Sequence, residues 1–124
     1  MDVALLTLAH KAGITRERAQ SAAPQLAAIP YESEQRYSAS LNHCPSGPRI
    51  AVKGAVETVL AMCVRMATRN GDAPLAANDI LAQAQALGAE GHRVLALAEG
   101  AARPTAERDF SRDDLADLTF LGLV

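Results

Sequence analysis

Lys53 and Gly54 stand at a point in the sequence where a side chain is well placed to meet a ligand. They follow the apolar, partly β-branched run at 50–52, and a segment with helical spacing that carries Glu57 comes next. These residue types predict a strand that stops, a glycine that lets the backbone turn, and a helix whose first turn holds a carboxylate favoured by the helix dipole. From the residues alone, Lys53 either contacts a ligand at this junction or lies in solvent as an ordinary strand end, with Gly54 serving only the turn.

Metal chemistry has little support in the sequence. The three histidines are isolated from one another, none precedes a proline, and the two cysteines do not form a metal-binding pattern. Asp113, Asp114 and Asp117 do not have the spacing of a calcium loop, so they indicate a solvated acidic turn. We therefore assign no metal ligands.

Length and charge place further bounds on the function. A chain of 124 residues is long enough for one domain with a single hydrophobic core. Its net charge of -2 provides no basic field for nucleic acid or an anionic membrane. No apolar run approaches the roughly 20 residues of a membrane helix, no signal peptide is visible, and two thiols fit a reducing cytosol. The apolar start and the apolar run at 118–124 suggest a domain excised from a longer protein, with Met1 supplied as a start codon.

The elements that must position Lys53 can be predicted from periodicity. Alternating residues at 37–42 predict a half-buried antiparallel strand, and 49–53 predict the second arm of a hairpin joined by a loop at 44–48. The apolar run at 94–98 predicts a central strand that Arg93 opens. The helix that follows the lysine is predicted to bury one face, formed by Val56, Val59, Leu60 and Cys63.

Patterns elsewhere are weaker. Spacing predicts a helix at 5–12 that Gly13 ends, and a second helix from an N-cap at Asn78 to a stop at Gly91. A brief strand is predicted at 29–31. The remaining segments are predicted to be connections: a short helix or irregular stretch at 15–28, a turn at 32–35, a polar connection at 65–74 that turns at 70–72, and a surface hairpin loop at 100–111. Together they predict an α/β (α+β) domain, with an antiparallel sheet of about five or six strands flanked by helices.

Residues 53–57, Lys-Gly-Ala-Val-Glu, resemble the Lys-Gly-Ala-Pro-Glu signature in the nucleotide-binding domain of P-type cation-transporting ATPases. Three further pieces occur in that family's order. They are an acidic-x-Ala-Leu helix opening at 2–6, a counterpart of the Pro-Phe-x-Ser segment at 29–34, and a counterpart of the segment leading into the phosphorylation domain at 91–98 and 118–124. The resemblance covers residues 1–124 and implies a single nucleotide-binding domain that is part of a larger membrane pump.

The resemblance implies a set of residues around the adenine. Tyr31 takes the place of the family's usual phenylalanine and would stack on the base, while Lys53 and Gly54 would form the pocket floor. Asp2 would face the adenine edge, although Met1 stands where the family has a threonine. Without the resemblance, Tyr31 also reads as a core tyrosine with its hydroxyl at the surface, and Asp2 as a helix-starting acid.

The resemblance also implies that Arg36 and Arg93 approach the phosphates. Arg36 takes the place of a family lysine, and the planar guanidinium of Arg93 suits a phosphate, although Arg93 alone also reads as a solvated strand end. Ser33 stands where some members carry arginine, so one phosphate contact of those members has no counterpart here. Val56 replaces the proline of the signature.

The function implied is ATP binding for a P-type cation pump. In such a pump the γ-phosphate passes to an aspartate of an Asp-Lys-Thr-Gly motif on a separate phosphorylation domain. That motif does not occur in this sequence, nor does a glycine-rich Walker A loop. The chain is therefore expected to bind ATP or ADP without hydrolysing it, to contain no catalytic residue, and to involve magnesium only in the full pump.

The expected partners are the phosphorylation and membrane domains of the same pump, on its cytoplasmic side, with no direct membrane contact and no nucleic acid. Two alternatives remain open from the sequence: a stand-alone module for another small ligand, and a structural or interaction domain that has lost its nucleotide. The sequence does not encode the transported cation, because transport ligands lie in membrane helices outside it.

Overall fold

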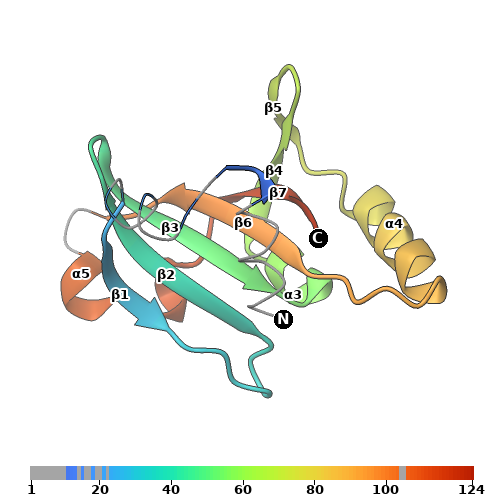
Figure 1. Ribbon diagram of the computed structural model, residues 1–124, viewed down its shortest axis with the longest axis horizontal. Helices are drawn as coiled ribbons and strands as arrows, with labels where there is room; N and C mark the ends of the chain where they lie inside the picture. The colour runs from blue at the N-terminus through green and yellow to red at the C-terminus, as the bar shows by residue number, and fades with distance from the viewer. Residues whose placement is uncertain (1–10, 14, 16–17, 19–20, 22, 104–105) are drawn as a thin grey trace.

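The computed structural model describes residues 11–13, 15, 18, 21, 23–103 and 106–124. Asp2 and most of the helix predicted at 5–12 lie outside these residues. Seven strands of the described chain form one sheet in the order β1-β2-β3-β6-β7-β4-β5 (Figure 1). Neighbouring strands are antiparallel, except that β4 and β7 are parallel. The strands are β1 (Gln25–Ile29), β2 (Tyr37–Cys44), β3 (Gly47–Gly54), β4 (Cys63–Thr68), β5 (Gly71–Pro74), β6 (Ala96–Ala101) and β7 (Leu118–Leu123).

The predicted fold class, an antiparallel sheet with helices, is confirmed, but the sheet formed by the described residues has seven strands rather than five or six. Two segments predicted as connections belong to it. Residues 25–29 form β1, so the strand expected at 29–31 ends where it was predicted to begin. Residues 63–74 form the β4–β5 hairpin in place of a polar connection. Strands β1 and β5 are the edges of the described sheet and are only five and four residues long, so their sequences carry little strand signal.

The β2–β3 hairpin is confirmed and is longer than predicted. Its two strands pair continuously along all eight residues of each. Residues 45 and 46 alone stay outside the ladder, so the loop expected at 44–48 is a two-residue turn. Gly47 follows with a φ of 123°, a conformation that glycine adopts without steric cost.

The helix predicted after Gly54 is α3 (Val56–Leu60), a short helix with Glu57 in its first turn. Cys63, expected on its apolar face, is instead the first residue of β4, although it is buried. Helix α3 contacts β3, β4, β6 and β7, so it covers one face of the sheet (Figure 1). Its buried residues are Val56, Val59 and Leu60.

Helix α4 (Ala77–Ala89) ends just before Gly91, whose φ of 90° fits the predicted glycine stop. Its start differs from the prediction, because Ala76 occupies the N-cap and no side chain caps the helix. The predicted Asn78 cap is therefore wrong. Ile80 is the buried residue of this helix, which packs against α3.

Strand β6 lies between β3 and β7, which confirms the predicted central strand. It starts at Ala96 rather than at 94 and runs on to Ala101, so the loop expected at 100–111 begins later. That segment also contains the short helix α5 (Ala106–Asp109), and the 3-10 turn η1 (Arg112–Asp114) follows it.

The hydrophobic core lies on the face of the sheet that α3 covers. Alternate residues of the central strands point into it and are almost completely buried, as the strand period requires. They include Tyr37, Leu41, Ile50, Val52, Ala96, Ala98, Leu118 and Phe120. The intervening residues of β2 and β3 face the opposite side, where most are polar or small.

Candidate functional site

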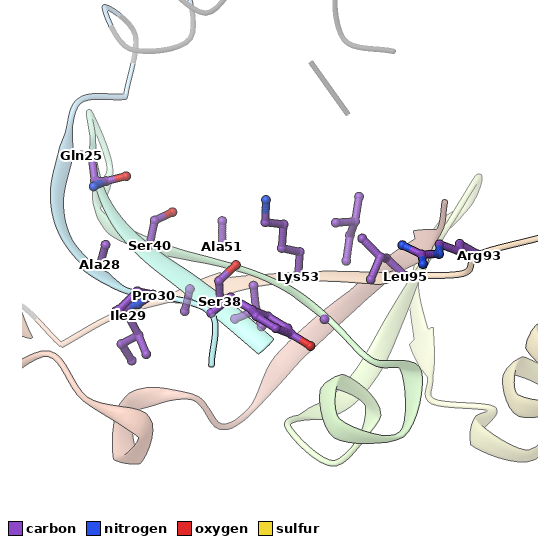
Figure 2. A pocket seen from close by; sticks show the side chains of 15 residues that line it. Gln25, Ala28, Ile29, Pro30, Ser38, Ser40, Ala51, Lys53, Arg93 and Leu95 are labelled. Carbon is purple, nitrogen blue, oxygen red and sulfur yellow. The ribbon is translucent and has the colours of Figure 1, made fainter. Parts of the chain in front are cut away.

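A cavity of about 840 Å³ lies on the sheet face opposite the core (Figure 2). Cross-strand pairing explains which side chains reach it. Ala28, Ser40 and Ala51 pair in a row across β1, β2 and β3, and Ser38, Lys53 and Leu97 pair in a row across β2, β3 and β6. Each row is on the non-core face because the side chains alternate with buried neighbours. The lining residues are Gln25, Ala28, Ile29, Pro30, Tyr31, Ser38, Ala39, Ser40, Ala51, Val52, Lys53, Gly54, Arg93, Leu95 and Leu97.

Lys53 lines this cavity from the second-last position of β3. Its side chain is half-buried and extends from the sheet beside Ala51 (Figure 2). The flanking Val52 and Gly54 are buried, so the strand alternation directs Lys53 away from the core. The lysine therefore brings a positive charge to a concave surface rather than to an open strand end.

Gly54 also lines the cavity, but its role in the backbone differs from the prediction. It is the last residue of β3 and does not have a positive φ, so it is not a turn glycine. Ala55, which follows it, has an extended conformation (φ −60° and ψ 140°) and is the N-cap of α3. A methyl carbon at Gly54 would lie 2.5 Å from the Arg36 carbonyl oxygen and 2.7 Å from the Tyr37 Cα atom. Glycine is required here because two backbone segments approach closely.

Tyr31 reaches the cavity from the segment that follows β1. Pro30, which has no backbone N–H, separates it from the strand. The side chain lines the cavity and is 60% exposed, so Tyr31 is not a core tyrosine. The tyrosine of the core is Tyr37, which is fully buried. An exposed ring at the edge of a cavity offers its face to a flat ligand.

Arg93 lies in the segment between α4 and β6, three residues before β6 begins. It is exposed and lines the cavity, and Figure 2 shows it beside Leu95. This segment is tied to the end of the chain, because Leu95 and Val124 exchange two backbone hydrogen bonds of 2.9 Å. The structure therefore brings Lys53 and Arg93 to one cavity from segments about forty residues apart, with the arginine outside the strand it was expected to open.

Of the other residues singled out from the sequence, those that the structure describes are not among the residues that line the cavity. Arg36 is exposed, adopts a left-handed φ of 63°, and is not among the residues that line the cavity. Asp2 lies outside the described residues. Ser33 is exposed in the turn at 33–35, and Val56 is buried in α3. Of the six site residues predicted, the described structure gathers four around one cavity: Tyr31, Lys53, Gly54 and Arg93.

Three polar residues of the cavity were not predicted: Gln25, Ser38 and Ser40. The two serines are half-buried on β2 and were recognisable as the polar half of the alternation at 37–42, which identifies the face but not a cavity on it. Gln25 could not be predicted as a cavity residue, because the sequence pattern predicted a short helix or irregular stretch at 15–28 rather than strand β1. With the two cations, these side chains can donate hydrogen bonds to a polar or anionic ligand.

The acidic turn is a structural feature, away from this cavity. Asp114 accepts a hydrogen bond from Arg103 Nε at 2.7 Å and another from the Ser111 backbone N–H at 3.0 Å. The Arg103 guanidinium, followed by the Ser111 N–H, holds the pKa of the Asp114 carboxyl below its ordinary value of 3.8. Asp113 and Asp117 are exposed, as predicted for a solvated turn, whereas the side chain of Asp114 is only 5% exposed. Among the described residues, no three His, Cys, Asp or Glu side chains are grouped to hold a metal ion.

Two other observations concern the described part of the chain. Burial raises the pKa of the Cys63 thiol to about 11, so at neutral pH it is protonated and a poor nucleophile. No helix there is long and apolar enough to cross a bilayer.

Comparison with known proteins gives concordant matches. A family model described as P-type ATPase, cytoplasmic domain N, matches residues 1–124. A probable cation-transporting ATPase F of Mycobacterium tuberculosis is 37% identical over 111 residues, which cover 89% of this chain and 12% of that protein. The cation-transporting ATPase pma1 of Synechocystis is 36% identical over 121 residues, 97% of this chain and 13% of that protein. The chain thus spans about one eighth of the length of these relatives.

Proposed function

The chain belongs to the P-type ATPase cytoplasmic domain N family, and on that premise we propose that it binds ATP in the cavity lined by Tyr31, Lys53, Gly54 and Arg93. The observation that carries the proposal is the convergence of an exposed aromatic ring and two cations on one concave surface. A volume of about 840 Å³ is within the range of small-molecule sites.

The base end of the site is formed by the tyrosine and the floor of the sheet. Tyr31 stacks on the adenine, and the apolar floor at Ala28 and Ala51 leaves the purine room to lie against β2 and β3. Lys53 and the Ser38 hydroxyl are opposite each other in the ladder, which supports a role for both at the purine edge. Asp2 joins this end of the site in the proposal, at the adenine edge.

The phosphate end is formed by the arginines. Arg93 is exposed at the cavity wall and reaches toward the phosphates, where its planar fork can bond to two oxygens. Arg36 is proposed to assist from the turn after Tyr31, outside the cavity lining. Because exposed charge contacts are screened by solvent, the base contributes more to affinity than the phosphates do.

The whole protein is proposed to be a cation pump, in which this chain holds ATP while the γ-phosphate passes to an aspartate on a separate phosphorylation domain. The chain alone binds nucleotide without hydrolysing it, and magnesium matters only in the full pump. Its partners are the phosphorylation and membrane domains of the same pump, with this domain on the cytoplasmic side.

Titration of the isotope-labelled chain with ATP, followed by NMR, tests the proposal. We expect the amide signals of residues 31, 38, 53, 54 and 93 to shift together and to saturate. GTP should bind more weakly than ATP, because the site reads the purine edge. Saturable binding of a different small anion without ATP binding would support a stand-alone module for another ligand. Binding of neither would leave a domain that has lost its nucleotide.

A further inference from the structure

Backbone hydrogen bonds hold the segment that carries Tyr31 to the cavity. The Glu32 carbonyl accepts hydrogen bonds from the N–H groups of Gln35 and Arg36, at 3.0 and 2.8 Å, which closes a turn immediately after Tyr31. The carbonyl of Arg36 then accepts a hydrogen bond of 2.9 Å from the Ala55 N–H. This last bond ties the turn to the end of β3. Arg36 has a φ of 63°, which lies in the left-handed region that is unfavourable for a residue with a side chain.

Gly54 determines whether this attachment is possible. It pairs with Tyr37, the first residue of β2, and a methyl carbon at Gly54 would overlap the Arg36 carbonyl oxygen at 2.5 Å and the Tyr37 Cα and Cβ atoms at 2.7 Å. Those atoms belong to the backbone or to a fully buried side chain, so they cannot move aside as the end of a flexible side chain can. Any other residue at position 54 therefore pushes the turn away from β3.

The position of Tyr31 depends on this backbone because the ring has little packing of its own. The side chain is 60% exposed, and the closed turn that follows it is fixed to β3 through Arg36 and Ala55. We propose that Gly54 is a positioning residue for nucleotide binding: by letting the turn at 32–36 lie on the end of β3, it sets the ring of Tyr31 at the cavity. This inference rests on the proposed nucleotide site.

The test compares Gly54→Ala with Gly100→Ala. Gly100 is also a buried strand glycine, and a methyl carbon there would lie 2.6 Å from Leu118 Cδ2, a side-chain atom remote from the turn. Both variants add one methyl group to the sheet, but only one of them displaces the turn. Amide exchange and chemical shifts are recorded for the ligand-free chains, and adenosine binding is measured by calorimetry.

We expect Gly54→Ala to speed exchange of the Ala55 amide, to shift the signals of residues 31–36 before any ligand is added, and to weaken adenosine binding roughly 5- to 150-fold, the range of one lost stacking contact. Gly100→Ala should keep the Ala55 amide protected and bind adenosine as the parent does. If the ligand-free turn is unchanged in Gly54→Ala, the positioning role is refuted, even if binding falls, because Gly54 would then contact the ligand directly.

A second variant decides the question if Gly54→Ala does not fold. Ala55 has a φ of −60°, which proline shares, so Ala55→Pro deletes the N–H donor without adding a methyl group at position 54. It should shift Tyr31 and weaken adenosine binding in the same range, whereas parent-like binding overturns the proposal. If the unmodified chain binds no adenosine, the proposed function fails, while the exchange and shift measurements on ligand-free protein still test the positioning.

Discussion

Lys53 and Ser38 are directly opposite each other in the β2–β3 ladder, and both line the cavity. On the other side of Lys53, Leu97 of β6 continues the same row. A hydroxyl, a cation and an apolar side chain therefore follow one another across three strands. Such a row can contact both the polar edge and the apolar face of one flat ligand, because cross-strand neighbours lie about 5 Å apart.

Removing the ring of Tyr31 should weaken ATP binding. Tyr31→Ala is expected to cost roughly 1–3 kcal/mol of binding free energy, the contribution of one base stacked on an aromatic ring. Tyr31→Phe keeps the ring and should bind within experimental error of the parent. Because Tyr31 is 60% exposed, neither variant should change the thermal midpoint much. Calorimetry on the three chains measures this, and equal affinity for Tyr31→Ala would contradict the assignment of the ring.

Lys53→Ala should lower the affinity for ATP by roughly 0.5–1.5 kcal/mol, the usual net contribution of one hydrogen bond in a protein. The thermal midpoint must be measured alongside, because lysine at a strand end also keeps that end hydrated. Arg49→Ala removes a positive charge from the same strand at a residue that is not among those lining the cavity, and serves as the matched control. A loss of affinity that only accompanies a lower midpoint would count against a direct contact.

Arg93→Ala should reduce the difference between ATP and AMP and leave adenosine binding unchanged. The arginine is exposed, so its contact with phosphate is modest and screened, and the loss for ATP should be at most about fivefold. In the parent, ATP, ADP and AMP should bind within about tenfold of one another. The measurement is calorimetry at two salt concentrations. If the affinity rises steeply with each added phosphate, or requires magnesium, the phosphates contribute more to the binding free energy than the base does, which contradicts the proposal.

The Arg103–Asp114 pair predicts a pH dependence of stability. Because Arg103 holds the folded-state pKa of Asp114 below 3.8, the carboxylate contributes stability above its unfolded-state pKa, and this contribution is lost as the pH falls through the lowered folded pKa. Asp114→Asn should therefore lower the urea midpoint at pH 7 and differ less from the parent as the pH falls below 3.8. Asp113→Asn removes a charge from the same turn without touching this pair, and serves as the control. If the urea midpoint of Asp114→Asn stays below that of the parent by the same amount down to acid pH, the ion pair is excluded as the cause of the difference.

The sequence by itself determined those elements whose signal is local. Apolar alternation at 37–42 predicted β2, because every second residue of a strand beside a core must be buried. The glycine at 91 marked the end of α4, and Glu57 marked the start of α3, since caps and first turns depend on the nearest few residues. The family resemblance, carried by 53–57 and three further segments, implied six site residues, of which Tyr31, Lys53, Gly54 and Arg93 line one cavity of the described structure.

Tertiary structure alone decided the remaining features. Strands β1 and β5 each pair with one neighbour and are only five and four residues long, so no local periodicity identifies them, although Leu26, Ala27 and Ile29 of β1 pack against the core. Gln25 joins the cavity only because β1 pairs with β2. The need for glycine at position 54 arises from the Arg36 carbonyl, eighteen residues earlier. Spacing along the chain does not encode such close approaches, because they depend on which strands become neighbours and in which register.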